Sequence, residues 1–235
     1  MITQLQPTQV SILHSLRYSQ AERFSSLMRP TGYTSDNFKF HLRKLTKLGY
    51  IEKLNNGMYQ LTPAGKEFAN NLDEPKRVVQ KQPKVSVLMV IAKKNANNET
   101  VYLVQNRLRN PYFGFWSEIH GRAEWGEPFE ATAKRQLKRQ TSLEAKFKIH
   151  GFRRVRDYDE ISNELLEDKL FVILKATDIS GELSNTYSGG TNAWMTLKDL
   201  RAEDKVFAST LANIQDLENG NFYKEQDIFY PPGDY

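Results

Sequence analysis

The stretch GRAEWGEPFEATAKRQLKRQTSLEA, Gly121–Ala145, decides the fold of the larger part of this chain. It combines a glycine turn, a short acidic segment and an amphipathic helix, an order typical of sites that hold a metal ion against a phosphate. Where such chemistry would need carboxylates, the helix carries Gln136, Arg139 and Gln140. Residues spaced i, i+3 and i+4 share one helical face, so these three side chains are predicted to lie together. The stretch indicates either a metal–phosphate site of unusual composition or a scaffold of that kind with another use.

The segments around this stretch are predicted to form a mixed sheet with helices. Four segments rich in β-branched and apolar residues are predicted strands: residues 85–94, 100–107, 146–158 and 169–178. Residues 206–220 have a helical pattern, and the aromatic, Pro-containing residues 229–235 are predicted to be irregular.

Together these segments resemble the Nudix fold, an α/β/α sandwich of hydrolases that act on nucleoside diphosphates linked to another moiety. Five residues match the Nudix box in register: Gly121, Glu127, Arg135, Leu137 and Leu143. The FGFW segment before the box and the AWMTLKDL segment after it resemble further parts of the family pattern.

The departures from the family fall on its chemistry. In the family, three glutamates carry the divalent metal ion that bridges the diphosphate and activates water. Here Gln136, Arg139 and Gln140 replace them, and Ser142 replaces the last glycine of the box. Mg²⁺ prefers carboxylate oxygens, and two like charges about 4 Å apart cost on the order of 4 kcal/mol at an effective dielectric constant near 20. We therefore expect no metal and no cofactor, and the sequence leans away from an enzyme without deciding the point.

A metal site rebuilt from other acids is the alternative. Four glutamates lie close enough in sequence to serve: Glu118, Glu124, Glu127 and Glu130. Under this alternative Glu127 is the catalytic residue and Mg²⁺ the cofactor of an active pyrophosphohydrolase. Glu127 also has a structural explanation, because a carboxylate at a helix start complements the helix dipole. In the family, moreover, this position pairs with the arginine that is Arg135 here.

Candidate ligand-binding residues lie before and within the box: Arg107, Arg109, Phe113, Trp116, Glu118, Arg135 and Arg139. Arginine binds phosphate bidentately without a metal, so Arg139 is a candidate counter-charge for a nucleotide. The equal alternative is that Arg139 is a solvated residue on a disused face. The aromatic residues can stack on a base or belong to the core.

The first third of the chain has a different pattern. Three segments with helical apolar periodicity come first: residues 7–18, 19–29 and 34–50. Ser19 is the predicted N-cap of the second helix, and Thr34 or Ser35 that of the third. Gly49 has the character of a residue that ends a helix. Asn55-Asn56-Gly57 then predicts a hairpin, and a further helix starts near residue 62.

Three helices, a hairpin and a helix resemble a winged helix-turn-helix. The wording HLRKLTKLGYIEKLNNGMYQLTPAGKEF is similar to the recognition helix, wing and following helix of ArsR- and MarR-type regulators, over about residues 5–72. Polar and basic side chains on the third helix and the hairpin suit base edges and phosphates. The predicted DNA-binding residues are Ser35, Asn37, Lys39, Arg43, Lys44, Lys47, Lys53, Asn55 and Asn56. The alternatives are a solvated face and a winged helix that docks a protein.

Charge supports the same division. Residues 1–80 carry 11 Lys and Arg against 6 Asp and Glu, whereas residues 81–235 carry 22 of each, so the net charge of +5 lies in the first part. A polyanion is the partner that such a distribution favours. The absence of cysteine excludes disulfides and thiolate zinc sites. No apolar run is long enough to span a membrane, and no signal-peptide pattern opens the sequence, so a cytoplasmic protein that does not engage membranes is expected.

These patterns predict an α+β chain of two domains. Residues 1–73 are predicted to be a winged-helix DNA-binding domain, residues 74–84 a linker, and residues 85–235 a Nudix-type α/β/α sandwich. Regulators that join a Nudix-like sensor to a winged helix are known, usually with the winged helix at the other end of the chain.

Three function classes follow from this organisation. The first is a transcription regulator that binds double-stranded DNA. Its degenerate Nudix domain then senses a nucleotide-like effector or mediates dimerisation, and a dimer would present two recognition helices about 34 Å apart. The second is the active pyrophosphohydrolase with an appended regulatory domain. The third is a protein-interaction module.

Overall fold

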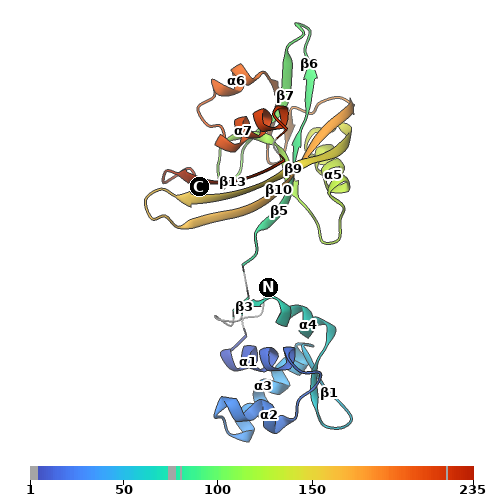
Figure 1. Cartoon of the computed structure of the whole chain (residues 1–235), viewed down its shortest axis with the longest axis vertical. Helices are drawn as coiled ribbons and strands as arrows, with labels where there is room; N and C mark the ends of the chain where they lie inside the picture. Colours follow the sequence, from blue (N-terminus) through green and yellow to red (C-terminus); the bar gives the residue numbers. More distant parts are fainter. Residues whose placement is uncertain (1–4, 74–77, 80, 221) are drawn as a thin grey trace. The chain divides into compact units, whose positions relative to one another are not determined.

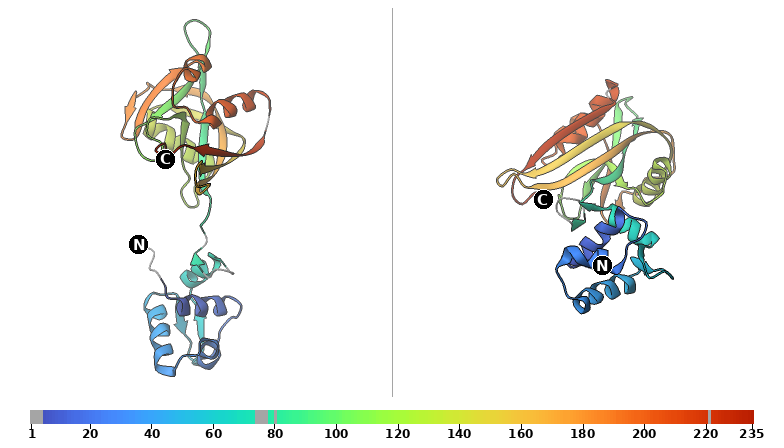
Figure 2. Two further views of the ribbon diagram at one scale, coloured as in Figure 1. Left: turned by 90° about the vertical axis from the view of Figure 1, so that its left-hand side faces the viewer. Right: turned by 60° about the horizontal axis from the view of Figure 1, so that its bottom comes forward.

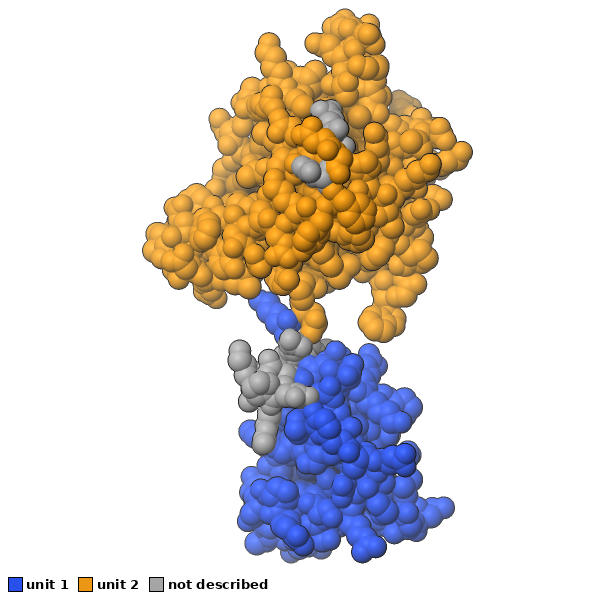
Figure 3. Space-filling model, in the orientation of Figure 1, with its two compact units in different colours: residues 1–81 blue, residues 82–235 orange. Residues whose placement is uncertain are grey.

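A computed structural model describes residues 5–73, 78–79, 81–220 and 222–235. The chain divides into two compact units, residues 1–81 and 82–235 (Figure 3). The boundary falls within the predicted linker, part of which has regular structure. Val78–Val79 (β4) pairs antiparallel with Leu72–Asp73 (β3), and the next strand starts at Lys84. Such short pairing uses backbone groups alone, so a polar composition does not prevent it. The linker residues 74–77 and 80 lie outside the described residues.

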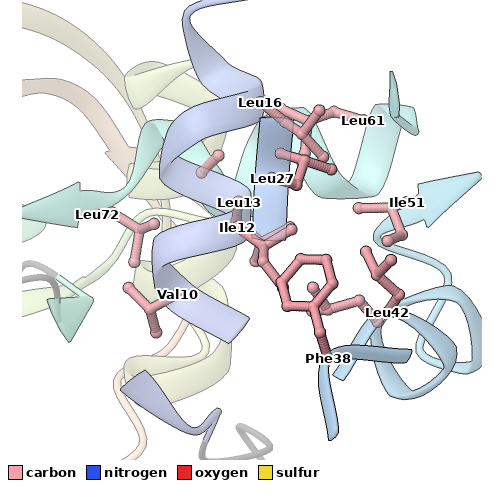
Figure 4. Close-up of a cluster of buried hydrophobic side chains, with 12 residues drawn as sticks. Val10, Ile12, Leu13, Leu16, Leu27, Phe38, Leu42, Ile51, Leu61 and Leu72 are labelled. Atoms are coloured by element: carbon pink, nitrogen blue, oxygen red, sulfur yellow. The ribbon is translucent and has the colours of Figure 1, made fainter. Parts of the chain in front are cut away.

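The first unit contains helices and one short hairpin. Its elements are α1 (Pro7–Arg17), α2 (Phe24–Met28), a 3₁₀ turn (Arg29–Thr31), α3 (Ser35–Lys47), β1 (Ile51–Lys53), β2 (Tyr59–Leu61) and α4 (Pro63–Asn70). The apolar stripes of the helices meet in one core (Figure 4). Phe38 and Leu45 of α3 and Leu13 of α1 are completely buried in it, so the predicted stripe of α3 is the face that packs inward.

The second helix is shorter than its sequence predicts. It begins at Phe24 after Arg23, whereas Ser19 is the predicted N-cap. The reason is a backbone bridge in which Glu22 and Tyr59 each donate to the other's carbonyl oxygen, over 2.9 and 2.8 Å. Residues near 22 are therefore extended beside the hairpin, and this long-range pairing overrides the local helical pattern.

Two glycines shape the hairpin and its surroundings. Gly57 has φ +80° in the turn, a region that favours glycine, and the Leu54 amide donates to the Met58 carbonyl oxygen over 2.7 Å to close it. Gly65 lies in the first turn of α4, where a Cβ atom would stand 1.8 Å from the Tyr50 carbonyl oxygen. Only glycine lets α4 rest on the chain that leaves α3.

The second unit is a nine-stranded sheet with helices on both faces (Figure 1). Its strands are β5 (Lys84–Val90), β6 (Ala92–Lys94), β7 (Thr100–Arg107), β8 (Trp116–Arg122), β9 (Glu144–Asp159), β10 (Leu165–Ser180), β11 (Thr186–Tyr187), β12 (Gly190–Met195) and β13 (Tyr223–Tyr230). Its helices are α5 (Phe129–Thr141), α6 (Leu197–Arg201) and α7 (Ala208–Glu218). The strand order is β11-β12-β7-β8-β5-β10-β9-β13, and β6 pairs with β7.

Alternation along the central strands separates two cores. On β5, Val87 and Met89 pack in the cluster that contains Leu137 of α5. The intervening Leu88 packs in the cluster that contains Ile214 of α7. Successive side chains of a strand point to opposite faces, so every residue of β5 and β8 is assigned to the α5 face or the α7 face. This assignment positions the candidate site.

The predicted irregular tail is wrong in its first part. β13 runs from Tyr223 to Tyr230 and pairs in parallel with β9, from Phe152 to Asp159 (Figure 2). The eight residues YKEQDIFY lack the apolar run of an inner strand because β13 is at the edge of the sheet and only alternate residues are shielded. Its pairing comes from backbone groups of β9, a contact over some 70 positions that local composition does not show.

Among the helices of the described residues, none combines the length and the apolar character that crossing a membrane would require.

Candidate functional site

The three unusual residues of the box helix α5 form a hydrogen-bond network. Gln136 Oε1 accepts from Arg139 Nη2 over 2.7 Å and from Gln140 Nε2 over 3.1 Å. The Gln136 amide donates to the Arg122 carbonyl oxygen over 3.2 Å, and the Gln140 amide donates to the His120 carbonyl oxygen over 2.9 Å. Both glutamines are buried. Their amide groups join α5 to the end of β8 by hydrogen bonds. Ionised carboxylates could not replace them, because a carboxylate has no hydrogen to donate.

The network continues across the sheet. Asn192 of β12 donates to the Gln140 carbonyl oxygen over 2.7 Å and accepts from Gln105 of β7 over 2.9 Å. Tyr187 donates to Gln105 Oε1 over 2.8 Å. Buried polar groups must find partners in this way to avoid a large desolvation cost. Gln136 and Gln140 therefore belong to the internal structure of the unit, whereas Arg139 is exposed.

Glu127 forms an ion pair with Arg135, the pairing that the family resemblance implies for this position. Its two carboxylate oxygens accept from Arg135 Nε over 2.7 Å and Nη2 over 2.6 Å, and Thr132 Oγ1 donates over 2.7 Å. These hydrogen bonds lower the pKa of Glu127 to about 2. Glu124 lies 3.3 Å from Arg135 Nη1. Both carboxylates are thus attached to the arginine that follows them.

The residues at the box do not fit a divalent cation. Gln136 offers one amide oxygen that already accepts two hydrogen bonds, and Arg139 brings a guanidinium to the same face. Glu118 belongs to the α7 face, where it is buried and accepts from Thr210 over 2.7 Å and from Asn213 over 3.1 Å. In the parts of the chain that the structure describes, no three acidic or histidine residues form a group suited to a metal ion. The four glutamates of the alternative metal site are not brought together.

The family of the second unit follows from these features and from a direct comparison. A model of the NUDIX domain matches residues 81–214, more than half of the chain. The chain belongs to the NUDIX family. The predicted resemblance of residues 85–235 to Nudix proteins is thereby confirmed at the level of the family.

Solved structures show the same fold at low identity. The NUDIX domain of Shewanella oneidensis NrtR complexed with ADP ribose is 18% identical, with a TM-score of 0.51 over 68% of this chain and 98% of that chain. A MutT protein from Bacillus halodurans is 20% identical, with a TM-score of 0.50 over 65% of this chain and 93% of that chain. A comparison with curated proteins finds no match.

A cavity of about 240 Å³ lies on the α7 face of the Nudix sheet. Leu88 of β5, His120 of β8 and Phe171 of β10 form part of its wall, and Thr210 of α7 closes one side. Three of the predicted ligand-binding residues line it: Arg107, Arg109 and Glu118. Four do not: Phe113, Trp116, Arg135 and Arg139.

Sheet geometry explains this separation. Arg135 and Arg139 are on α5, which covers the face opposite to the cavity, whereas sequence proximity placed them with the residues before the box. The Trp116 indole donates to Glu203 over 3.0 Å, and Phe113 is an exposed loop residue. The side of the sheet on which each residue lies is decided by strand alternation and helix packing, which the box pattern does not contain.

The cations of the cavity wall divide into two classes. Lys84 pairs with Glu167 and Lys169 pairs with the buried Asp157. Arg107 holds the neighbouring loop through the carbonyl oxygens of Arg109, Asn110 and Pro111, at 3.0, 3.2 and 2.5 Å. The remaining two are Arg109 and Arg122, which are exposed and for which the described residues include no ion-pair partner. Their positive charges are therefore not neutralised by a carboxylate of the described residues.

His120 supplies a neutral acceptor to the cavity wall. Its Nδ1 lies 3.1 Å from the Glu118 carbonyl oxygen, which can only accept, so Nδ1 carries the proton and Nε2 is an acceptor. Burial lowers the pKa of His120 to about 4. The ring is therefore uncharged at neutral pH.

The depressed pKa of His120 predicts a loss of stability in acid. Between pH 6.5 and about 4 the unfolded chain binds the proton more tightly, so the free energy of unfolding falls as the pH is lowered through this window, by at most about 1.4 kcal/mol per pH unit from this residue. Above pH 6.5 the full stability is present. Denaturant unfolding of the wild type and His120→Asn at pH 4.5 and 7.5 measures this, and the variant should lose less stability on acidification. An equal loss in both proteins would contradict the assignment.

The first unit gathers basic residues between α3 and the hairpin. Lys39, Arg43 and Lys47 of α3 line one hollow with Lys53 of β1. The other predicted DNA-binding residues do not line it: Ser35, Asn37, Lys44, Asn55 and Asn56. Asn56 shapes the turn, since its Oδ1 accepts from the Met58 amide over 3.0 Å.

One exposed residue of α3 escaped the sequence prediction. Phe40 is 56% exposed, but only polar and basic residues were selected as DNA-binding candidates. The signal that would have found it is an aromatic residue outside the helix's apolar stripe.

Proposed function

We propose that this chain is a DNA-binding transcription regulator. Its first unit would be a winged helix-turn-helix that binds double-stranded DNA, and its Nudix domain would sense a nucleotide-like ligand without a divalent metal or mediate dimerisation. The observation that carries the proposal is the convergence of Lys39, Arg43, Lys47 and Lys53 on one hollow between a helix and a hairpin.

The geometry of α3 suits the major groove. Its 13 residues make a helix about 20 Å long, and the apolar stripe that faces the core leaves the opposite side for DNA. Basic side chains of the hairpin and of α3 would meet the phosphates beside the groove, while other side chains of α3 meet base edges. The excess of positive charge in residues 1–80 adds attraction to the whole phosphate backbone.

The Nudix domain supports a sensing role better than a hydrolytic one. The three box positions are used for the network that joins α5 to β8, and the cavity on the α7 face has Arg109 and Arg122 as exposed cations. Arginine can neutralise and orient a phosphate without a metal. A domain of this fold, that of NrtR, is complexed with ADP ribose, so a nucleotide of this class is the first ligand to test.

Thermal unfolding with ADP-ribose, with and without Mg²⁺, tests the ligand. A ligand bound only by the folded state at 100 times its Kd stabilises it by about 2.7 kcal/mol, which raises the Tm by roughly 5–10 °C for a domain of this size. We expect this shift without Mg²⁺. Arg109→Ala/Arg122→Ala should abolish it, whereas Arg139→Ala on the opposite face should keep it.

The reverse pattern would place the ligand at α5 and contradict the cavity as its site. Hydrolysis of ADP-ribose with Mg²⁺ or Mn²⁺ that Glu127→Gln abolishes would favour an active enzyme instead.

DNA binding is tested by electrophoretic shift of genomic fragments over a salt series. A regulator should bind more weakly as salt rises, because phosphate contacts release counterions. No binding at 50 mM salt would reject the DNA role and favour a protein-interaction module.

A further inference from the structure

Phe40 stands at the outermost point of α3. At about 100° per residue, it lies about 160° around the helix from both Phe38 and Leu42, which are buried in the core. It therefore points directly away from the body of the unit. The ring is 56% exposed and does not belong to the buried core of its unit.

Basic residues of the proposed DNA surface lie beside the ring. Arg43 and Lys44 are three and four residues further along and so adjoin Phe40 on the helix surface. Lys47 is two turns away on the same side. Asp36, four residues before Phe40, also adjoins it, but its carboxylate is paired with Lys39 over 3.1 Å. The remaining charges beside the ring are positive, which matches a partner whose polyanionic edges flank an apolar feature.

The ring is also held in place. It makes an edge contact with His41, with centroids 5.4 Å apart, and His41 stacks on Tyr33 at the same centroid distance. His41 itself is only 8% exposed. A ring supported in this way loses little conformational entropy when it makes a contact.

We propose that Phe40 reads the C5-methyl group of a thymine in the major groove of the bound DNA. This inference rests on the proposed DNA-binding function and deepens it from non-specific attraction to a base preference. The thymine methyl is the apolar group that the major groove presents, and phenylalanine is one of the side chains that contact it. The phosphates on either side of the groove account for Arg43, Lys44 and Lys47.

Uracil substitution tests the contact directly, because uracil pairs as thymine does but lacks the methyl group. A double-stranded sequence is selected from a random library with the full chain, and each of its thymines is then replaced by uracil in turn. The wild type should bind one of these substituted duplexes about fourfold more weakly, the loss expected for one methyl group that is no longer buried.

Phe40→Ala should bind the thymine and uracil duplexes equally, and Phe40→Leu should keep part of the preference because it keeps an apolar contact. Phe229→Ala is the matched control: it removes an exposed phenylalanine of the Nudix unit and should leave the preference at its wild-type value. Unfolding curves verify that each variant is folded.

The outcomes separate the inference from the proposed function. Binding by the wild type with no thymine preference at any position, or a preference that survives in Phe40→Ala, overturns the role of Phe40 and leaves the DNA function standing. A change of oligomeric state in Phe40→Ala with the thymine preference intact assigns the ring to a contact between copies. A wild type that binds no DNA at low salt defeats the proposed function itself.

Discussion

Arg43→Ala/Lys47→Ala should weaken DNA binding by roughly 10- to 100-fold near physiological salt, with a similar loss for every sequence. Both side chains line the hollow between α3 and the hairpin, where each would neutralise a phosphate. Every phosphate contact contributes about −0.9 to the slope of log Kobs against log salt, so the variant's slope should be shallower by about two. Fluorescence anisotropy over 50–300 mM salt measures both quantities.

The control must remove the same charge from another surface of the same unit. Arg17→Ala/Lys66→Ala does so, because these residues line a separate hollow formed by α1, α4 and the end of β2. We expect a small and uniform loss of affinity from the change in net charge. If the two double variants lose affinity equally, the unit attracts DNA by its overall charge and α3 is not the contact surface.

Gly121→Ala should destabilise the Nudix unit by about 1–3 kcal/mol, the usual cost of forcing an extra group into a packed site. A Cβ at this position would stand 2.3 Å from Cδ of Gln136. Gln136 cannot move aside freely because its amide is held by Arg122, Arg139 and Gln140. Thermal unfolding should show a decrease in Tm of roughly 2–12 °C.

A double-mutant cycle identifies the cause. Gln136→Ala alone loses the network, but in Gly121→Ala/Gln136→Ala the clash is gone, so the double variant should be destabilised by clearly less than the sum of the single effects. Additive effects would show that Gly121 acts through something other than the side chain of Gln136.

The local sequence pattern predicted correctly those elements whose position depends only on their own residues. The stripe of α3, the turn at Asn55-Asn56-Gly57 and the helix after Pro128 all appear where periodicity, turn residues and caps predict them. The family resemblance is confirmed over residues 81–214, and the sequence could show it because the box is a contiguous pattern with fixed spacing.

The local sequence pattern failed where contact with a distant segment of the chain determines the secondary structure. Ser19 does not start α2, because Glu22 pairs with Tyr59 across the unit. Phe229 and Tyr230, the first two residues of the predicted irregular tail, end the strand β13, because β9 offers that strand a free edge. In both cases the backbone forms its hydrogen bonds with a segment far away in sequence. The local amino-acid composition does not indicate which segment that is.

The candidate site shows the same limit at the level of chemistry. By itself the sequence determined that carboxylates are missing from the box and that basic residues concentrate in residues 1–80, since both depend only on residue identity. Only the tertiary structure decided that Gln136 and Gln140 fasten α5 to β8, and that the cavity opens on the face away from Arg139. The physical reason is that each strand residue points to one of two faces, and which face becomes a packed core and which a cavity depends on the helices that cover it.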